Sequence, residues 1–427
     1  MPRRNLIILL LAVFVAVLCH GRVATNRHGR ILLDALAEIE QRYVRPVSPD
    51  RLYEGAMRGM VDQLDDPYSR FISADELVRF NETLNMEFGG VGMEVSQDPQ
   101  TRQLRVVAPI YGTPAYQAGI RSGDVILRID GRATQGLSLS DAVGLMRGPP
   151  GSSVSLRIRR PKADEPIEVS LQRERIKVDT VLGDTRRPDG SWVFSLTDDP
   201  QIGYVRISDF SQRTADDLRQ VIEQLLAQGM RGLILDLRND PGGLLDAAVD
   251  VSDMFINSGT IVSVERRKET RTFTASPSDT LPDFPMVVLV NRDSASASEI
   301  VAACLKDHGR AKVAGERSYG KGTVQQVLSL EGELGALKLT TARYVRPNGR
   351  NIDRHVDSTD DDDWGVRPSP GMDLPLDDEE FAKYRVWRLR SDIPEADQPE
   401  DDDDELSDFV DRQRRRAVEW LRERIEQ

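Results

Sequence analysis

The sequence predicts an α/β protein core that follows a helical region and a small strand-rich domain. Three observations support this fold class. Between residues 200 and 310, short apolar strands alternate with amphipathic helices, a pattern typical of crossover architecture. Between residues 86 and 160, short β-type runs alternate with turns rich in Gly, Pro and Asp. Ahead of both, residues 30–85 repeat apolar side chains at helical spacing.

Length, charge and cysteine content limit the classes of protein that fit. The chain has 427 residues, enough for two or three domains with cores of their own. Its net charge of −13 offers nothing to offset phosphate repulsion, so we expect no nucleic-acid partner. The acidic runs at 360–363 and 400–405 are typical of solvated segments. The two cysteines, Cys19 and Cys304, provide no disulfide framework, and Cys304 is expected in the core.

The N-terminus, residues 1–24, is predicted to be an export signal or a short membrane anchor. Two arginines precede an apolar run of 14 residues from Leu6 to Cys19. This run is shorter than the roughly 20 residues that a spanning helix usually needs. We therefore expect an exported protein, in the periplasm or on the outer face of the cytoplasmic membrane. Membrane contact is expected only through this segment, whose cleavage stays open.

The elements follow from local patterns in four further regions: an N-terminal helical region (25–85), a strand-rich domain (86–160), the α/β core (170–350) and an acidic C-terminal extension (351–427). The first contains a turn around Pro67 and a helix start at Ser73. The second has strands near 91–95, 104–107, 125–129 and 154–159, with short helices at 114–118 and 140–147.

In the core, we expect strands at 203–208, 232–237 and 286–291, each followed by a helix: 214–228, 244–255 and 296–306. Open α/β sheets place their sites in the turns after strands. The extension ends in a helix at 406–425, which we expect to be a solvated structural helix.

The turns of the core favour a serine nucleophile with a lysine base. A cluster of three serines, Ser294, Ser296 and Ser298, opens an apolar helix, and Lys321 lies between two glycines that let neighbouring backbone close around it. Burial lowers the pKa of a lysine and makes it a proton acceptor. The chain has only 4 histidines, which leaves few candidates for a serine–histidine pair. The non-catalytic alternatives are that Ser296 only caps the helix and that Lys321 is an exposed loop lysine. Composition does not distinguish the three serines from one another.

Several segments in order resemble the C-terminal processing peptidases, also called tail-specific proteases. They are the turn at 64–69, the Gly-rich loop at 88–93, and the segments 236–243, 294–300 and 319–325. The resemblance covers roughly residues 30–350 and weakens after Asn351, where an acidic insertion at 353–363 replaces the usual ending of the family. It implies an α/β protease core built as a crotonase-like or Clp-protease-like spiral of β-β-α units, with a PDZ domain at 86–160.

The resemblance also implies roles for individual residues. Ser296 would be the nucleophile, Lys321 the general base, and Gln325 a residue that orients the lysine, one helical turn away if the segment is helical. Asp307 would be supporting. The oxyanion donors would be the amide of Gly242 or Gly243 together with that of Ala297. In the PDZ-like domain, the loop that grips a substrate carboxylate would consist of Gly90, Val91, Gly92 and Met93.

The predicted function is that of an exported serine endopeptidase that recognises protein C-terminal tails and cleaves peptide bonds. Its partners would be proteins or peptides with accessible C-termini. No cofactor or metal is expected, because the sequence has no metal-ligand spacing, phosphate loop or dinucleotide fingerprint. One alternative is a catalytically silent PDZ scaffold that binds tails, and another is a core that handles a thioester. Substrate identity and oligomeric state stay open.

Overall fold

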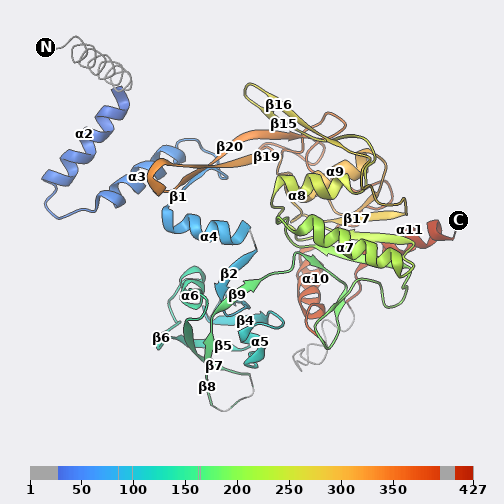
Figure 1. Ribbon diagram of the computed structural model, residues 1–427, viewed down its shortest axis with the longest axis horizontal. Coiled ribbons are helices and arrows are strands. Elements are labelled where there is room, and N and C mark those ends of the chain that lie inside the picture. Colours follow the sequence, from blue (N-terminus) through green and yellow to red (C-terminus); the bar gives the residue numbers. More distant parts are fainter. Residues whose placement is uncertain are drawn as a thin grey trace, which may run out of the picture. The chain divides into compact units, whose positions relative to one another are not determined.

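The computed structural model describes residues 27–84, 86–98, 100–161, 163, 165–394 and 409–426 (Figure 1). The predicted export segment lies outside the described residues. The chain divides into two compact units: Met1–Leu77 with Gln325–Thr340, and Val78–Val324 with Thr341–Gln427.

The first unit is helical with a short sheet. Helices α2 (Arg27–Arg42) and α3 (Pro49–Asp62) precede strand β1 (Arg70–Ile72). Helix α4 (Ala74–Leu84) begins in this unit and continues past its last residue, Leu77. β1 pairs antiparallel with the first residues of β20 (Ala336–Val345), which also pairs with β19 (Thr323–Ser329). Ser69 fastens the predicted turn: its hydroxyl donates to Asp66 and accepts from the Thr340 amide. The helical expectation for 25–85 missed β1, which is too short to show a period of its own.

The strand-rich domain combines strands with two short helices around an apolar core of its own. The main sheet has the order β3 (Met93–Gln97), β4 (Leu104–Pro109), β5 (Val125–Ile129), β7 (Ser153–Arg159) and β8 (Ile167–Gln172). Strand β6 (Arg132–Ala133) pairs with β5, and β2 (Glu87–Gly90) pairs with β9 (Glu174–Lys177). Helices α5 (Pro114–Gln117) and α6 (Leu139–Met146) lie where short helices were expected. β3 is an edge strand, so its outer side is open to a further strand.

The α/β core is built on a sheet with the order β10 (Val181–Leu182), β13 (Ile202–Ile207), β14 (Gly232–Asp236), β17 (Met286–Val290) and β18 (Lys312–Gly315). The last four are parallel. Helices α7 (Thr214–Ala227), α8 (Leu245–Asp253) and α9 (Ala297–Asp307) supply the crossovers. The short antiparallel pair β11 (Thr185–Arg186) and β12 (Trp192–Val193) precedes β13.

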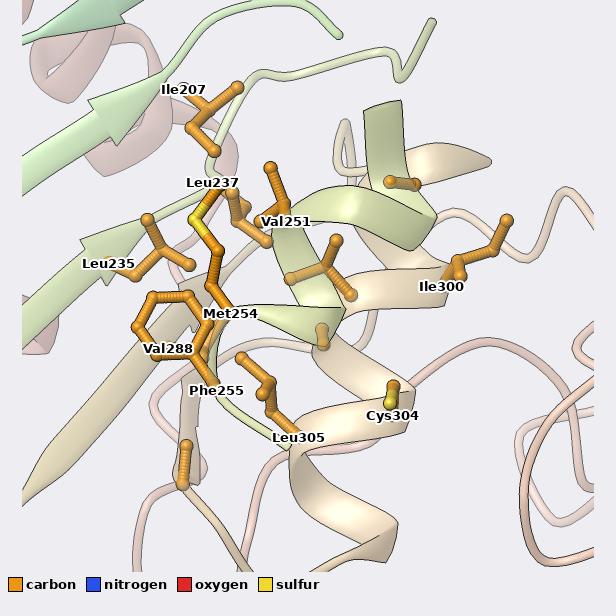
Figure 2. Close-up of a cluster of buried hydrophobic side chains, with 14 of the residues drawn as sticks. Ile207, Leu235, Leu237, Val251, Met254, Phe255, Val288, Ile300, Cys304 and Leu305 are labelled. Carbon is orange, nitrogen blue, oxygen red and sulfur yellow. The ribbon is translucent and has the colours of Figure 1, made fainter. Parts of the chain in front are cut away.

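Every residue of β14 and of β17 is buried, because the sheet is covered on both faces. Leu235 and Val288 face one cluster, which also contains Val251 of α8 and Ile300 of α9 (Figure 2). Cys304 of α9 belongs to this cluster, as expected of a core cysteine, and burial raises the pKa of its thiol to about 12.

The opposite face of the sheet is covered by the C-terminal extension. Helix α11 (Arg412–Ile425) packs against β14 and β17 through Ala417, Val418 and Leu421. The expectation of a solvated terminal helix is therefore wrong. Helix α10 (Asp378–Ser391) precedes it.

A second sheet layer lies over α8 and α9. Strand β15 (Gly259–Arg266) forms an antiparallel hairpin with β16 (Thr270–Ala275) and pairs on its other side with the end of β20. Ile261, Val262 and Val264 of β15, with Tyr344 of β20, join the same apolar cluster as the helices. This layer places Tyr344 close to the start of α9.

Candidate active site

Ser296 lies at the N-terminus of α9, directly after the loop that follows β17. It is the N-cap residue of the helix, with φ 55° and ψ −111°. A non-glycine residue in this region of backbone space is strained, and such strain is concentrated at functional sites. The surrounding sequence of Ala and Ser residues has no bulky side chain that would prevent so tight a turn. Ser296 is 7% exposed.

The structure separates the three serines that the sequence left equivalent. The Ser294 hydroxyl donates to the Leu237 carbonyl at 2.8 Å. The Ser298 hydroxyl donates to the Asp240 carbonyl at 3.0 Å. Both side chains are fully buried, so their hydroxyls serve the backbone. Ser296 retains accessible surface, and Ser296, rather than Ser294, is the cap of the helix.

Glu299 joins the serine turn to the lysine loop. Its Oε2 accepts hydrogen bonds from the amides of Ser296, at 2.9 Å, and Lys321, at 2.8 Å. Its Oε1 accepts from the Ser318 hydroxyl and from the Gly320 amide. Two segments that are 25 residues apart in sequence thus meet on one carboxyl oxygen. The carboxyl is fully buried, and burial raises its pKa against the lowering effect of these four donors.

Lys321 is held in a loop that needs both flanking glycines. A Cβ on Gly322 would lie 2.3 Å from the Asp353 nitrogen, and one on Gly320 would lie 2.7 Å from Arg354 Cβ. The Lys321 side chain is half-buried. Burial lowers its pKa, while the nearby Glu299 carboxyl acts in the opposite direction. The site therefore increases the fraction of neutral amine, as a general base requires.

Tyr344 is a site residue that the sequence analysis missed. Its main-chain nitrogen donates to the Gly322 carbonyl at 2.8 Å, which attaches β20 to the lysine loop. Burial raises the pKa of its phenol, and a hydrogen bond with Ser296 lowers it. No motif marks this tyrosine, because it comes from a strand of the second sheet.

Glu299 lies within the serine motif at 294–300, but the sequence analysis assigned it no role. Its position three residues after Ser296 is the capping-box spacing, a signal that could have identified it.

The Asp240–Gly243 turn lies against Ser296. A Cβ on Gly242 would come within 2.9 Å of Ser296 Cβ and within 2.9 Å of the Ala297 nitrogen. Gly242 and Gly243 have φ of 103° and 145°, which favour glycine. The Gly242 amide donates to Asp240 Oδ1 at 2.8 Å and is therefore occupied. Within the described part of the chain, the amides of Gly243 and Ala297 donate no hydrogen bond, so they are the two candidate oxyanion donors.

Gln325 and Asp307, which the resemblance placed beside Ser296 and Lys321, lie in different elements and bond to different partners. Gln325 lies in strand β19, so the helical spacing considered for it does not apply; its Nε2 donates to Thr340 Oγ1 at 3.2 Å. Asp307 ends α9 and accepts two hydrogen bonds from Arg346, at 2.9 and 2.7 Å. Asp307 thus ties α9 to the segment after β20.

The predicted carboxylate-binding loop joins β2 to the edge strand β3. Gly92 has φ 75°, and a Cβ there would collide with Thr113 at 2.3 Å. The Thr113 hydroxyl and the Ile110 amide both donate to the Gly92 carbonyl. The amides of Val91 and Gly92 make no hydrogen bond with other described residues. Gly90 ends β2 and Met93 begins β3, so the four predicted residues form one continuous turn at the strand start.

The acidic insertion packs against the lysine loop. The Arg354 amide donates to the Gly320 carbonyl at 2.8 Å, and Asp353 accepts from the Gly322 amide at 3.3 Å. The insertion lines a cavity of about 510 Å³ together with Arg350 and Asn351.

Neither a metal site nor a membrane span is found in the part of the chain that the structure describes. Its His, Cys, Asp and Glu side chains form no group of three or more that could hold a metal ion. None of the helices within the described ranges of residues 27–394 and 409–426 is long and apolar enough to cross a membrane.

Comparisons with known proteins show the family to which the chain belongs. Residues 201–367 match the model of peptidase family S41, residues 105–160 match a PDZ domain, and residues 29–76 match the N-terminal domain of the activating protease CtpB. A carboxy-terminal-processing protease of Bartonella bacilliformis is 37% identical over 84% of this chain and 78% of its own length. The chain belongs to peptidase family S41, among the carboxy-terminal processing proteases.

Other relatives have similar names. The carboxy-terminal processing protease CtpA of Bacillus subtilis is 33% identical over 80% of this chain and 68% of its own length. Among solved structures, a photosystem II D1 C-terminal processing protease is 31% identical, covers 82% of this chain and 94% of its own, and has a TM-score of 0.48. As a member of this family, the chain is a serine-type protease with a PDZ domain that acts on protein or peptide substrates.

Proposed function

We propose that this S41 protease cleaves peptide bonds with Ser296 as nucleophile and Lys321 as general base. The observation that carries the proposal is the shared Glu299 oxygen, which lies within 3 Å of the amide nitrogens of both residues. The strained backbone of Ser296 and the lowered pKa of Lys321 add support. A serine hydroxyl is a weak nucleophile at neutral pH, so an adjacent neutral amine supplies the missing base.

In this mechanism, neutral Lys321 accepts the hydroxyl proton as Ser296 Oγ attacks the scissile carbonyl carbon. The negative oxygen of the tetrahedral intermediate is stabilised by the amides of Gly243 and Ala297. The lysine ammonium then donates its proton to the leaving amine, and an acyl ester on Ser296 remains. Lys321 next accepts a proton from water as the water oxygen attacks the ester carbon. The ammonium returns that proton to Ser296 Oγ as the ester bond breaks, which releases the carboxylic acid product and regenerates the serine and the neutral lysine. Gln325 would orient the lysine amine.

Variants of the two residues test the mechanism. We expect Ser296→Ala and Lys321→Ala each to lower kcat for an unfolded test protein by several orders of magnitude. Ser278→Ala, at an exposed loop serine, and Lys312→Ala, at an exposed lysine of β18, are the matched controls and should cleave as the parent does. Undiminished turnover in either site variant would refute the dyad. Tight tail binding without turnover in the parent would favour a scaffold.

We also propose that the protein is exported and works in the periplasm or on the outer face of the cytoplasmic membrane. The two arginines and the apolar run from Leu6 to Cys19 support this proposal. Fractionation of cells that express the full chain measures the location. Recovery in the cytoplasmic fraction alone would contradict it.

A further inference from the structure

Asp240 is a fully buried acidic residue that the mechanism above does not use. Its side chain lies in the turn between β14 and α8, and none of it is exposed. Oδ1 accepts the Gly242 amide at 2.8 Å. Oδ2 has no hydrogen-bond partner among the described residues. A buried carboxyl with one oxygen unpaired is costly, so its position calls for a physical explanation.

The main chain of Asp240 is fastened to the nucleophile segment. Its carbonyl accepts the Ala295 amide at 3.0 Å and the Ser298 hydroxyl at 3.0 Å. These two donors lie on either side of Ser296. One residue therefore holds the glycine turn through its carboxyl group and the nucleophile turn through its carbonyl group.

The surroundings of the Asp240 carboxyl favour its neutral form. The loop after β13 contributes Asp209, whose negative charge raises the pKa of Asp240 further. Helix α9 contributes the Ser298 hydroxyl, and its own turn contributes the Gly242 amide; both act in the lowering direction. No cation is among these groups from the described residues. Burial dominates and holds the pKa of Asp240 well above its usual range.

We propose that Asp240 is a positioning residue whose carboxyl group sets the oxyanion hole. By engaging the Gly242 amide, the carboxyl fixes the glycine turn against Ser296. The amides of Gly243 and Ala297 are then left as the pair that binds the substrate oxygen. This inference rests on the proposed Ser296 mechanism, because it assigns the geometry of that acyl-transfer site.

Two substitutions distinguish the contribution of the carboxyl's shape to kcat from the contribution of its charge. Asp240→Asn keeps an acceptor oxygen in an uncharged group of the same shape, so we expect kcat within about threefold of the parent at pH 7. Asp240→Ala removes the acceptor and frees the Gly242 amide. Loss of one oxyanion donor typically costs on the order of 10²–10³ in kcat. We expect a fall of that size for Asp240→Ala, with KM within about threefold.

A peptide aldehyde and the matching peptide alcohol supply a readout that a general structural role would not move. The aldehyde forms a tetrahedral adduct with Ser296 and places an oxygen in the hole, whereas the alcohol only occupies the binding groove. Asp240→Ala should lose affinity for the aldehyde by a factor similar to its loss of kcat and should bind the alcohol as the parent does. Unchanged kcat and aldehyde affinity, or equal losses of aldehyde and alcohol affinity, would overturn the proposal.

The pH dependence of stability gives a test that does not need a folded Asp240→Ala. Because the folded-state pKa of Asp240 is raised above 3.8, the stability from its neutral form is complete below that pH and is lost as pH rises toward the folded value. Asp240→Asn lacks this loss, so its melting temperature should exceed that of the parent by a margin that grows with pH.

Two further results would count against the inference. A lower Tm for Asp240→Asn at every pH, or a fall in its kcat as large as that of Asp240→Ala, would show that the site needs the charged carboxylate. A parent enzyme that neither cleaves nor binds the aldehyde would instead refute the proposed mechanism, and the two failures are distinguishable.

Discussion

At the scale of single residues, the site depends on buried polar groups whose charge is set by their surroundings. Glu299 is fully buried with four donors, Lys321 is half-buried beside it, and Asp240 is buried with one oxygen unpaired. The hydroxyls of Ser294 and Ser298 donate hydrogen bonds to main-chain carbonyls. The local packing thus leaves Ser296 as the serine that a substrate can reach.

The Lys321 base predicts a pH profile. Burial lowers the pKa of Lys321 below its usual 10.5, and the reaction requires the neutral amine. We therefore expect kcat/KM to rise with pH through this lowered pKa and to level off below pH 10.5. Rates on a short peptide from pH 6 to 10.5 measure the profile. A rate that is flat over the whole range, or that still rises tenfold per unit at pH 10.5, would contradict the assignment.

At the scale of elements, the C-terminal segments complete the core. Most of α11 consists of Arg and Glu, yet Gln413, Ala417 and Leu421 recur every four residues and are fully buried. This narrow stripe covers the face of the sheet opposite α8 and α9. The sequence analysis missed it because the charged majority of the helix conceals a short apolar stripe, and long arginine stems cover apolar surface.

A buried ion-pair network links this element to the β14 turn. Arg238 is fully buried and donates to Asp236 and to Asp411, with Gln413 as a further acceptor. We expect Arg238→Met to lower the free energy of unfolding by about 3–5 kcal/mol, because it leaves two buried carboxylates without their cation. Urea unfolding followed by fluorescence measures the change.

Arg422→Met, on α11 itself, is the control for an exposed ion pair of this helix. Arg422 pairs with Asp199 at 2.8 Å, but its side chain is 45% exposed, and exposed pairs contribute about 0–1 kcal/mol. A cost of Arg238→Met no larger than that of Arg422→Met would show that the network does not hold α11 on the sheet.

At the scale of the whole molecule, a PDZ domain is joined in one chain to a protease core. The edge strand β3 and the turn from Gly90 to Met93 can accept an extended peptide and its terminal carboxylate. The Val91 and Gly92 amides are the donors on which carboxylate binding would depend.

This arrangement predicts that a free carboxyl terminus increases cleavage. We expect an unfolded test protein with a free terminus to be cleaved with a higher kcat/KM, by at least threefold, than the same protein with an amidated terminus. Mass spectrometry of the products over time measures both rates. The Ser296→Ala protein should still bind the free tail more tightly than the amidated one. Equal rates and equal affinities would show that tails are not read by their carboxylate.

Much of the fold was predictable because its patterns are local. Alternating apolar strands and amphipathic helices predicted β13, β14, β17 and the three crossover helices to within two residues at each end. The hairpin of β15 and β16 and the strand β1 were not predicted. β15 does not alternate between buried and exposed residues, β16 has no buried residue, and β1 has only 3 residues. The serine and lysine motifs were predictable from their residues and from their resemblance to known peptidases.

The sequence by itself determined the family, the α/β core, the PDZ segment and the two motifs that contain Ser296 and Lys321. Each of these is encoded by residues that lie close together in the sequence. The tertiary structure decided which of three serines is accessible, that Glu299 and Tyr344 contact both Ser296 and the loop that contains Lys321, that the Gly242 amide is occupied, and that α11 is packed. Those outcomes depend on burial and on contacts between segments far apart in the chain. No local pattern encodes them, because the free energy of a buried polar group depends on what folds around it.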